Sequence, residues 1–305
     1  MLRSRLIFVA LMLALAGLAA YGQGTRAITV STEPSATVWI DGVSYGKTDD
    51  KGSLAIRTVA AGAHTLKVRA AGFKEKSQPL TAVQKGEVKI DLVKTTDEAE
   101  LAFQDGERLS SSDRDKAVAA YKNAIKLRPN YPDAFVAMAR VLTDQGNLDE
   151  AQAAIASARK VRPVYAEASA VQGRIYKESD SEAKAIAAFK RAITEGKGFQ
   201  PEAYAGLGLL YKDKAETFGG SGDFDNEKIY SDLAADDLSK SLKQLSGAPD
   251  AIVIYQLLGL VYERQKKVKE AIALYEEFLR VFRDVPEADA VRSFIVQLKK
   301  ANPGQ

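Results

Sequence analysis

Apolar and polar residues alternate with a period of two along residues 26–94. The alternating apolar positions fall into short groups: Ile28/Val30, Val38/Ile40, Leu54/Ile56, Leu66/Val68 and Val88/Ile90/Leu92. Such alternation is typical of strands with one buried face, and turns such as Asp41-Gly42 and Ala71-Gly72 separate the groups. The pattern predicts a small antiparallel β-sandwich or barrel over residues 26–94.

From residue 98 onward the period becomes that of α-helices, and an internal repeat appears. Ala117, Ala151 and Ala185 open similar segments and lie 34 residues apart. One helical hairpin of this length cannot bury its apolar face alone, so such repeats stack into a solenoid. Small residues at matching positions of the first helices let the second helices approach closely: Ala139, Gly173, Gly208 and Gly259. The pattern predicts an all-α solenoid of five helix pairs and a C-terminal cap helix within residues 98–300.

The fourth repeat contains an insertion, GGSGDFDNEKIYSD, at residues 219–232. Its alternating acids resemble those of a calcium loop, but Lys228 stands where the turning glycine is needed and Ala234 where the bidentate glutamate is needed. We therefore expect a flexible, solvated loop between the two helices of this repeat, and contact with a partner stays open as a role. The function of the wider segment 213–229 is not decided by the sequence.

The first 22 residues have the layout of a secretory signal peptide. Arg3 and Arg5 precede an apolar run from Leu6 to about Ala20, and small residues follow. This run is short for a membrane span, which needs about 20 residues. We expect export to the periplasm or cell envelope of a bacterium, and membrane attachment only if the segment is retained.

Composition excludes several kinds of chemistry. The chain has no cysteine and a single histidine, His64, so disulfides, thiolate nucleophiles and cysteine-rich zinc sites are excluded. His64 lies at the start of an expected strand with no nucleophile tied to it, and we interpret it as structural. The formal charge of +3 is too small for a nucleic-acid binder. We expect no enzymatic activity, no cofactor and no metal.

The stretch DGVSYGKT, residues 41–48, ends as a phosphate-binding loop does. Such a loop needs four residues between its two glycines and must open a helix, whereas only three separate Gly42 from Gly46 and a strand pattern follows Thr48. We interpret the stretch as a turn between strands, and we expect no nucleotide site.

The repeat pattern resembles the tetratricopeptide repeat family over about residues 98–285. The β half resembles the PEGA domain, a small module of exported bacterial proteins, from the WIDG stretch at Trp39 through GAHTLKV to AAGF ending at Phe73. The glycine of the naming motif is absent from Pro34-Ser35-Ala36. The resemblance implies domains at 26–94 and 98–300, after a signal peptide at 1–22.

The resemblance to tetratricopeptide repeats also implies that the first helix of each pair lines a concave binding face. The side chains expected to point into this groove are Arg140, Arg174, Lys177, Leu209, Lys212 and Gln256. Their basic members suit an extended peptide with an acidic segment or a C-terminal carboxylate, because guanidinium groups give charge-assisted bonds. Ordinary surface charges paired with Glu167 and Glu178 are the alternative.

The sequence therefore predicts a non-catalytic scaffold or adaptor that mediates protein–protein interaction in the cell envelope through the concave helical face. An alternative is that the β module binds envelope carbohydrate such as peptidoglycan, with the helices as a spacer. Trp39 falls on the strand face opposite Val38 and Ile40, where it either packs or contacts a ligand.

Overall fold

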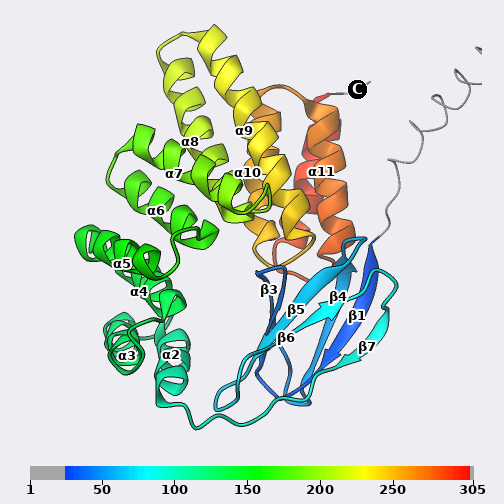
Figure 1. The fold of residues 1–305 in the computed structure, drawn as a ribbon. Helices are drawn as coiled ribbons and strands as arrows, with labels where there is room; N and C mark the ends of the chain where they lie inside the picture. Colours follow the sequence, from blue (N-terminus) through cyan, green and yellow to red (C-terminus); the bar gives the residue numbers. More distant parts are fainter. Residues whose placement is uncertain (1–24, 303–305) are drawn as a thin grey trace, which may run out of the picture.

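The computed structural model describes residues 25–302 and consists of a β module followed by a helical array (Figure 1). The predicted signal segment, residues 1–22, lies outside the described residues. Within the described part of the chain, none of the helices is both long and apolar enough to cross a membrane.

The β module is a sandwich of two sheets. Its strands are β1 (Arg26–Ser31), β2 (Thr37–Ile40), β3 (Val43–Lys47), β4 (Ser53–Val59), β5 (His64–Arg69), β6 (Lys76–Leu80) and β7 (Gly86–Lys89). One sheet has the order β4-β1-β7 and the other β3-β2-β5-β6. Strands β1 and β7 pair in parallel, and all the remaining strand pairs are antiparallel. The alternating apolar residues form the core between the sheets, with Val30, Val38, Leu66 and Val68 fully buried, so the predicted sandwich is confirmed.

Eleven helices follow in the described chain, and they form five antiparallel pairs and a cap. They are α2 (Glu98–Leu109), α3 (Arg114–Leu127), α4 (Pro132–Asp144), α5 (Leu148–Val161), α6 (Ala166–Glu178), α7 (Glu182–Glu195), α8 (Pro201–Gly220), α9 (Phe224–Leu245), α10 (Ala251–Arg264), α11 (Val268–Val281) and α12 (Ala288–Ala301). Figure 1 shows the pairs stacked along an arc from α2 to α11. This is the predicted solenoid.

Glycines on the first helices account for the close packing inside four of the five pairs, all except α4–α5. A Cβ atom at Gly173 would lie 2.5 Å from the Phe189 ring of α7. A Cβ atom at Gly259 would lie 2.2 Å from the Tyr275 hydroxyl of α11. Only a residue without a side chain allows the aromatic ring to reach the backbone of the facing helix, as the sequence pattern predicts.

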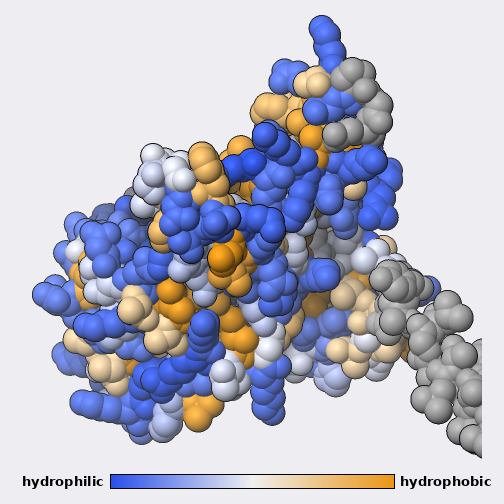
Figure 2. All heavy atoms as spheres, turned by 90° about the horizontal axis from the view of Figure 1, so that it is seen from above, coloured by the Kyte–Doolittle hydropathy of each residue, from blue (hydrophilic) through white to orange (hydrophobic). Residues whose placement is uncertain are grey.

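The prediction of a flexible loop at residues 219–232 is wrong. Helices α8 and α9 continue through most of the insertion, and only Ser221–Asp223 form the turn between them. The added residues lengthen both helices into a hairpin that projects from the array (Figure 1). Seen from that end, the surface is mostly hydrophilic, with apolar side chains gathered near its middle (Figure 2). The Asp223 side chain caps α9 by accepting a hydrogen bond from the Asn226 amide. One of the acids that resemble those of a calcium loop is therefore a helix cap.

The stretch DGVSYGKT forms the β2–β3 hairpin, as the interpretation of a turn between strands requires. Asp41 and Gly42 have positive φ angles of 51° and 83° at the turn. Thr48 is buried, and its hydroxyl donates to the Glu33 carbonyl at 2.7 Å. No helix begins in this segment, so it has no helix N-terminus whose amide groups could hold a phosphate.

Candidate functional site

The β module contacts the solenoid near both ends of the arc. At the far end, the Tyr45 hydroxyl donates to the Leu245 carbonyl at 3.2 Å, and Thr58 and Ser246 each donate from the side-chain hydroxyl to the other's carbonyl, at 2.7 and 2.6 Å. Val43 is buried in the same apolar cluster as the last helices. Burial raises the pKa of the Tyr45 phenol to about 12, so this contact keeps its proton over the physiological pH range.

At the near end, the β module contacts helix α2. The Gln104 side-chain amide accepts from the Gly72 amide and donates to the Phe73 carbonyl, both at 2.8 Å. Arg69 of β5 forms ion pairs with Glu107 of α2 and with Glu75, and its guanidinium lies 4.7 Å from the centre of the Phe103 ring. Both ends of the solenoid are thus tied to one small sandwich.

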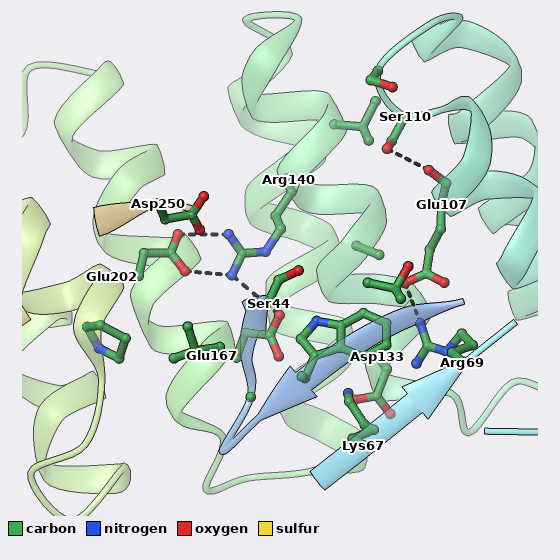
Figure 3. A pocket seen from close by; sticks show the side chains of 18 of the residues that line it. Ser44, Lys67, Arg69, Glu107, Ser110, Asp133, Arg140, Glu167, Glu202 and Asp250 are labelled. Atoms are coloured by element: carbon green, nitrogen blue, oxygen red, sulfur yellow. Dashed lines mark hydrogen bonds and ion pairs between the residues drawn. The ribbon is translucent and has the colours of Figure 1, made fainter. Parts of the chain in front are cut away.

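A cavity of about 1320 Å³ lies between the two modules. One wall is the outer face of the sheet β3-β2-β5, and the other is the concave face of the first helices, from α2 through α4, α6 and α8 to the start of α10. Figure 3 looks into this space, with Arg140 and Glu202 on the helical wall and Ser44, Lys67 and Arg69 on the strands. The volume exceeds the roughly 300–1,000 Å³ of small-molecule pockets.

The sheet wall is a two-row grid of polar and aromatic side chains. Strand register places Lys47, Thr37 and Arg69 side by side in one row. Ser44, Trp39 and Lys67 form the next row. The Lys67 ammonium lies 4.6 Å from the centre of the Trp39 indole, which is a cation–π contact. Trp39, which the sequence left between packing and ligand contact, therefore faces the cavity.

The helical wall is centred on Arg140 of α4. Its guanidinium donates to both carboxylate oxygens of Glu202 at 2.8 and 2.6 Å, and to Glu167 at 3.3 Å. Burial alone raises the pKa of Glu202, but the charge and hydrogen bonds of Arg140 lower that pKa below its usual value. The guanidinium is therefore fully engaged by acids of α6 and α8.

The other basic groove residues are also paired. Arg174 bonds to Asp144 of α4, while Lys177 lies 3.7 Å from Glu178 and Lys212 lies 2.9 Å from Glu216. Pairs of this kind recur between neighbouring repeats at separations of 29 to 32 residues: Arg128–Asp97, Arg162–Asp133, Arg174–Asp144 and Lys214–Glu182. The basic residues predicted for the groove are thus neutralised by neighbouring acids and do not form an uncompensated basic strip.

The structure divides the predicted site residues, the six of the groove and Trp39 of the β module, into two sets. Arg140, Arg174 and Trp39 line the cavity. The remaining four are absent from that lining and lie elsewhere on the first helices: Lys177, Leu209, Lys212 and Gln256. Residues of the β2–β3 hairpin and β5 complete the site, and sequence reasoning missed them because it treated the β module as a separate surface.

His64 is held as an ordinary part of the sandwich. Its Nδ1 lies 2.6 Å from the Asp41 carboxylate and its Nε2 lies 3.0 Å from the Ala60 carbonyl. Both ring nitrogens thus have partners within the module. Over residues 25–302, no group of three or more histidine, aspartate or glutamate side chains is placed to hold a metal ion.

Comparison with known proteins agrees with this architecture. A model of the PEGA domain family matches residues 25–96, and models of the tetratricopeptide repeat match residues 108–175 and 252–284. The chain is therefore a tetratricopeptide repeat protein with an N-terminal PEGA domain, and both resemblances are confirmed. Tetratricopeptide arrays are, as a class, scaffolds for protein–protein interaction.

Solved structures of other proteins share the helical fold. Yeast Tom70 aligns with a TM-score of 0.53 and 16% identity over 68% of this chain and 41% of its own. The Cut9–Hcn1 assembly of APC/C aligns with a TM-score of 0.51 and 15% identity over 68% of this chain and 38% of that chain. The MamA protein has 23% identity at a TM-score of 0.43, over 64% of this chain and 96% of its own. Identities this low show the fold alone. No curated protein matches the sequence.

Proposed function

We propose that this protein is a non-catalytic scaffold of the bacterial cell envelope that holds an extended segment of a partner protein in the cavity between its two modules. The observation that carries the proposal is the cavity itself, whose lining comes from the PEGA sheet and from the first helices of all five repeats. Concave solenoid faces bind extended segments, and the volume suits a peptide better than a metabolite.

The setting in the envelope rests on two features of the chain. The first 22 residues have the order of charged, apolar and small residues that directs export. The PEGA match adds support, since this domain occurs in exported proteins.

The position of Trp39 favours a single binding site formed by both modules over a carbohydrate site on the β module alone. A wall-binding module working alone would present its aromatic residue to the outside, whereas Trp39 faces the helices across the cavity. In this proposal the solenoid forms half of the binding site. If the helices were only a spacer, their concave face would have no role.

A cavity-filling variant tests the proposal. Ala205 lies half-buried on α8 and lines the cavity, whereas Ala156 is exposed on α5 outside it. The full chain, Ala205→Trp and Ala156→Trp are used as baits in envelope extract of the parent cell, and captured proteins are compared by mass spectrometry. We expect a partner that binds the full chain and Ala156→Trp but is lost with Ala205→Trp.

The same partner set for all three baits would refute binding in the cavity. Separate halves of the chain are poor baits, because Val43 is buried against the last helices and would be exposed by cutting between the modules.

A further inference from the structure

The sheet wall of the cavity carries two lysines, Lys47 and Lys67, that acids compensate weakly or not at all. Lys47 is exposed and makes no ion pair or side-chain hydrogen bond with any of residues 25–302. Lys67 is 30% exposed, and its closest acid, Glu75, lies 3.7 Å away. Arg69, by contrast, is 13% exposed and paired with two acids. Lys47 is therefore free to meet a ligand, and Lys67 is held by a single long ion pair that a ligand carboxylate can replace.

The groups around these lysines also suit a polar ligand. Within the described chain, the hydroxyls of Thr37 and Ser44 form no side-chain hydrogen bond, and both line the cavity next to Trp39. The Asp41 carboxylate, the acid on this wall, is occupied by the His64 ring and by the Thr65 amide. The result is an indole face bordered by donors.

The opposite wall has the opposite balance of charge. Between α4 and the start of α10, five acids and two arginines line the cavity: Asp133, Asp144, Glu167, Glu202, Asp250, Arg140 and Arg174. Both arginines are engaged by these acids. An anionic group entering the cavity is therefore repelled from this stretch of the helical wall and attracted to the sheet.

We propose that the PEGA sheet, and not the arginines of the helical groove, recognises the partner, and that the partner segment is an extended peptide with acidic side chains facing Lys47 and Lys67. The inference rests on the proposed function, since it assigns the chemistry of the same cavity. Carboxylates of the segment bond to the two ammonium groups, and a neighbouring apolar part of the segment packs on Trp39.

The test uses random peptides as probes, so the natural partner need not be identified first. A phage-displayed library of random linear peptides is selected on the full chain, and the enriched peptides are synthesised and measured by fluorescence anisotropy. The variant is Lys47→Glu with Lys67→Gln. Its control is Lys51→Glu with Lys85→Gln, which makes the same change in charge at exposed lysines outside the cavity lining.

We expect enrichment of Asp and Glu, affinity about tenfold weaker in the cavity variant and unchanged in the control, and weaker binding at high salt. Peptides that bind, are lost with Ala205→Trp and yet show no acidic preference would overturn this inference and leave the proposed function standing. If no selected peptide is lost with Ala205→Trp, the proposed function fails as well. Sedimentation with purified peptidoglycan that only the cavity variant loses, without acidic peptides, would assign the sheet to carbohydrate instead.

Discussion

Arg140 and Glu202 form a bidentate ion pair, with the two guanidinium nitrogens 2.8 and 2.6 Å from the two carboxylate oxygens, although their helices belong to the second and fourth repeats. Each side chain is 32% exposed. Glu167, from the repeat between them, joins the same guanidinium at 3.3 Å. One arginine thus ties three consecutive repeats together, so its first role is to brace the concave face around the cavity.

Removing Arg140 should destabilise the fold. Arg140→Ala leaves the carboxylates of Glu202 and Glu167 close together without a cation, and we expect a loss of about 1–2 kcal/mol in the free energy of unfolding. Urea denaturation followed by circular dichroism measures it. Arg280→Ala is the control, because Arg280 is 71% exposed and its removal should change stability by less than about 0.5 kcal/mol. Equal stability of the two variants would mean that the brace contributes nothing.

The same pair should make stability depend on pH. Arg140 lowers the pKa of Glu202 in the folded chain, so the pair is fully stabilising above the unfolded pKa of about 4.3 and is lost as pH falls through the folded pKa. The difference in unfolding free energy between the wild type and Glu202→Gln should therefore be largest near neutral pH and shrink on acidification. Denaturation series at several pH values measure this difference. A difference that stays constant from neutral to acid pH would contradict the assignment.

Close helix packing gives a prediction at Gly173. A Cβ atom there would lie 2.5 Å from the Phe189 ring, so Gly173→Ala should destabilise by about 1–3 kcal/mol despite the better helix propensity of alanine. Gly220→Ala, at the end of α8, meets nothing within 4 Å and should be neutral or slightly stabilising. Thermal unfolding of the two variants compares them directly, and a Gly173→Ala protein as stable as the wild type would show that the packing is loose.

The far contact between the modules rests on the reciprocal hydrogen bonds of Thr58 and Ser246. Thr58→Val keeps the shape but removes the hydroxyl that donates to the Ser246 carbonyl, which should cost about 1 kcal/mol. Hydrogen exchange of strand β3 and of the loop after α9 should then be faster, with the centre of the solenoid unchanged. Thr194→Val, on the exposed face of α7, is the control. Unchanged exchange at β3 would mean that this contact does not hold the modules together.

Local physics made most of the fold predictable. Burial of Val30, Val38 and Leu66 follows from alternation along single strands, and the approach of Phe189 to Gly173 follows from spacing within one repeat. The prediction for the insertion was right that Gly219 and Gly220 end a helix, but it failed for the residues after them, whose alternating acids and glycine resemble a loop. The turn after them takes only Ser221–Asp223, and the residues from Phe224 onward already belong to α9.

The candidate site was less predictable because it depends on contacts distant in sequence. Tyr45 meets Leu245, 200 residues away, and no local pattern signals that docking. The pairing of Arg174 with Asp144, 30 residues away, could have been predicted from the sequence. Aligning the repeats shows which acidic residues lie about one repeat before or after each groove arginine. Lys47 and Lys67 face the cavity only because the β module docks over the groove, which no local pattern in the sequence signals.

The central claim is that one partner segment lies between the sheet and the helices, and site-specific photo-crosslinking tests it most directly. Benzoylphenylalanine is introduced into the full chain at position 39 on the sheet wall, at 205 on the helical wall and, as a control, at exposed position 156. We predict that positions 39 and 205 crosslink to the same short segment of one partner and that 156 does not. Crosslinks from 156 alone, or from 39 and 205 to unrelated proteins, would contradict a shared site.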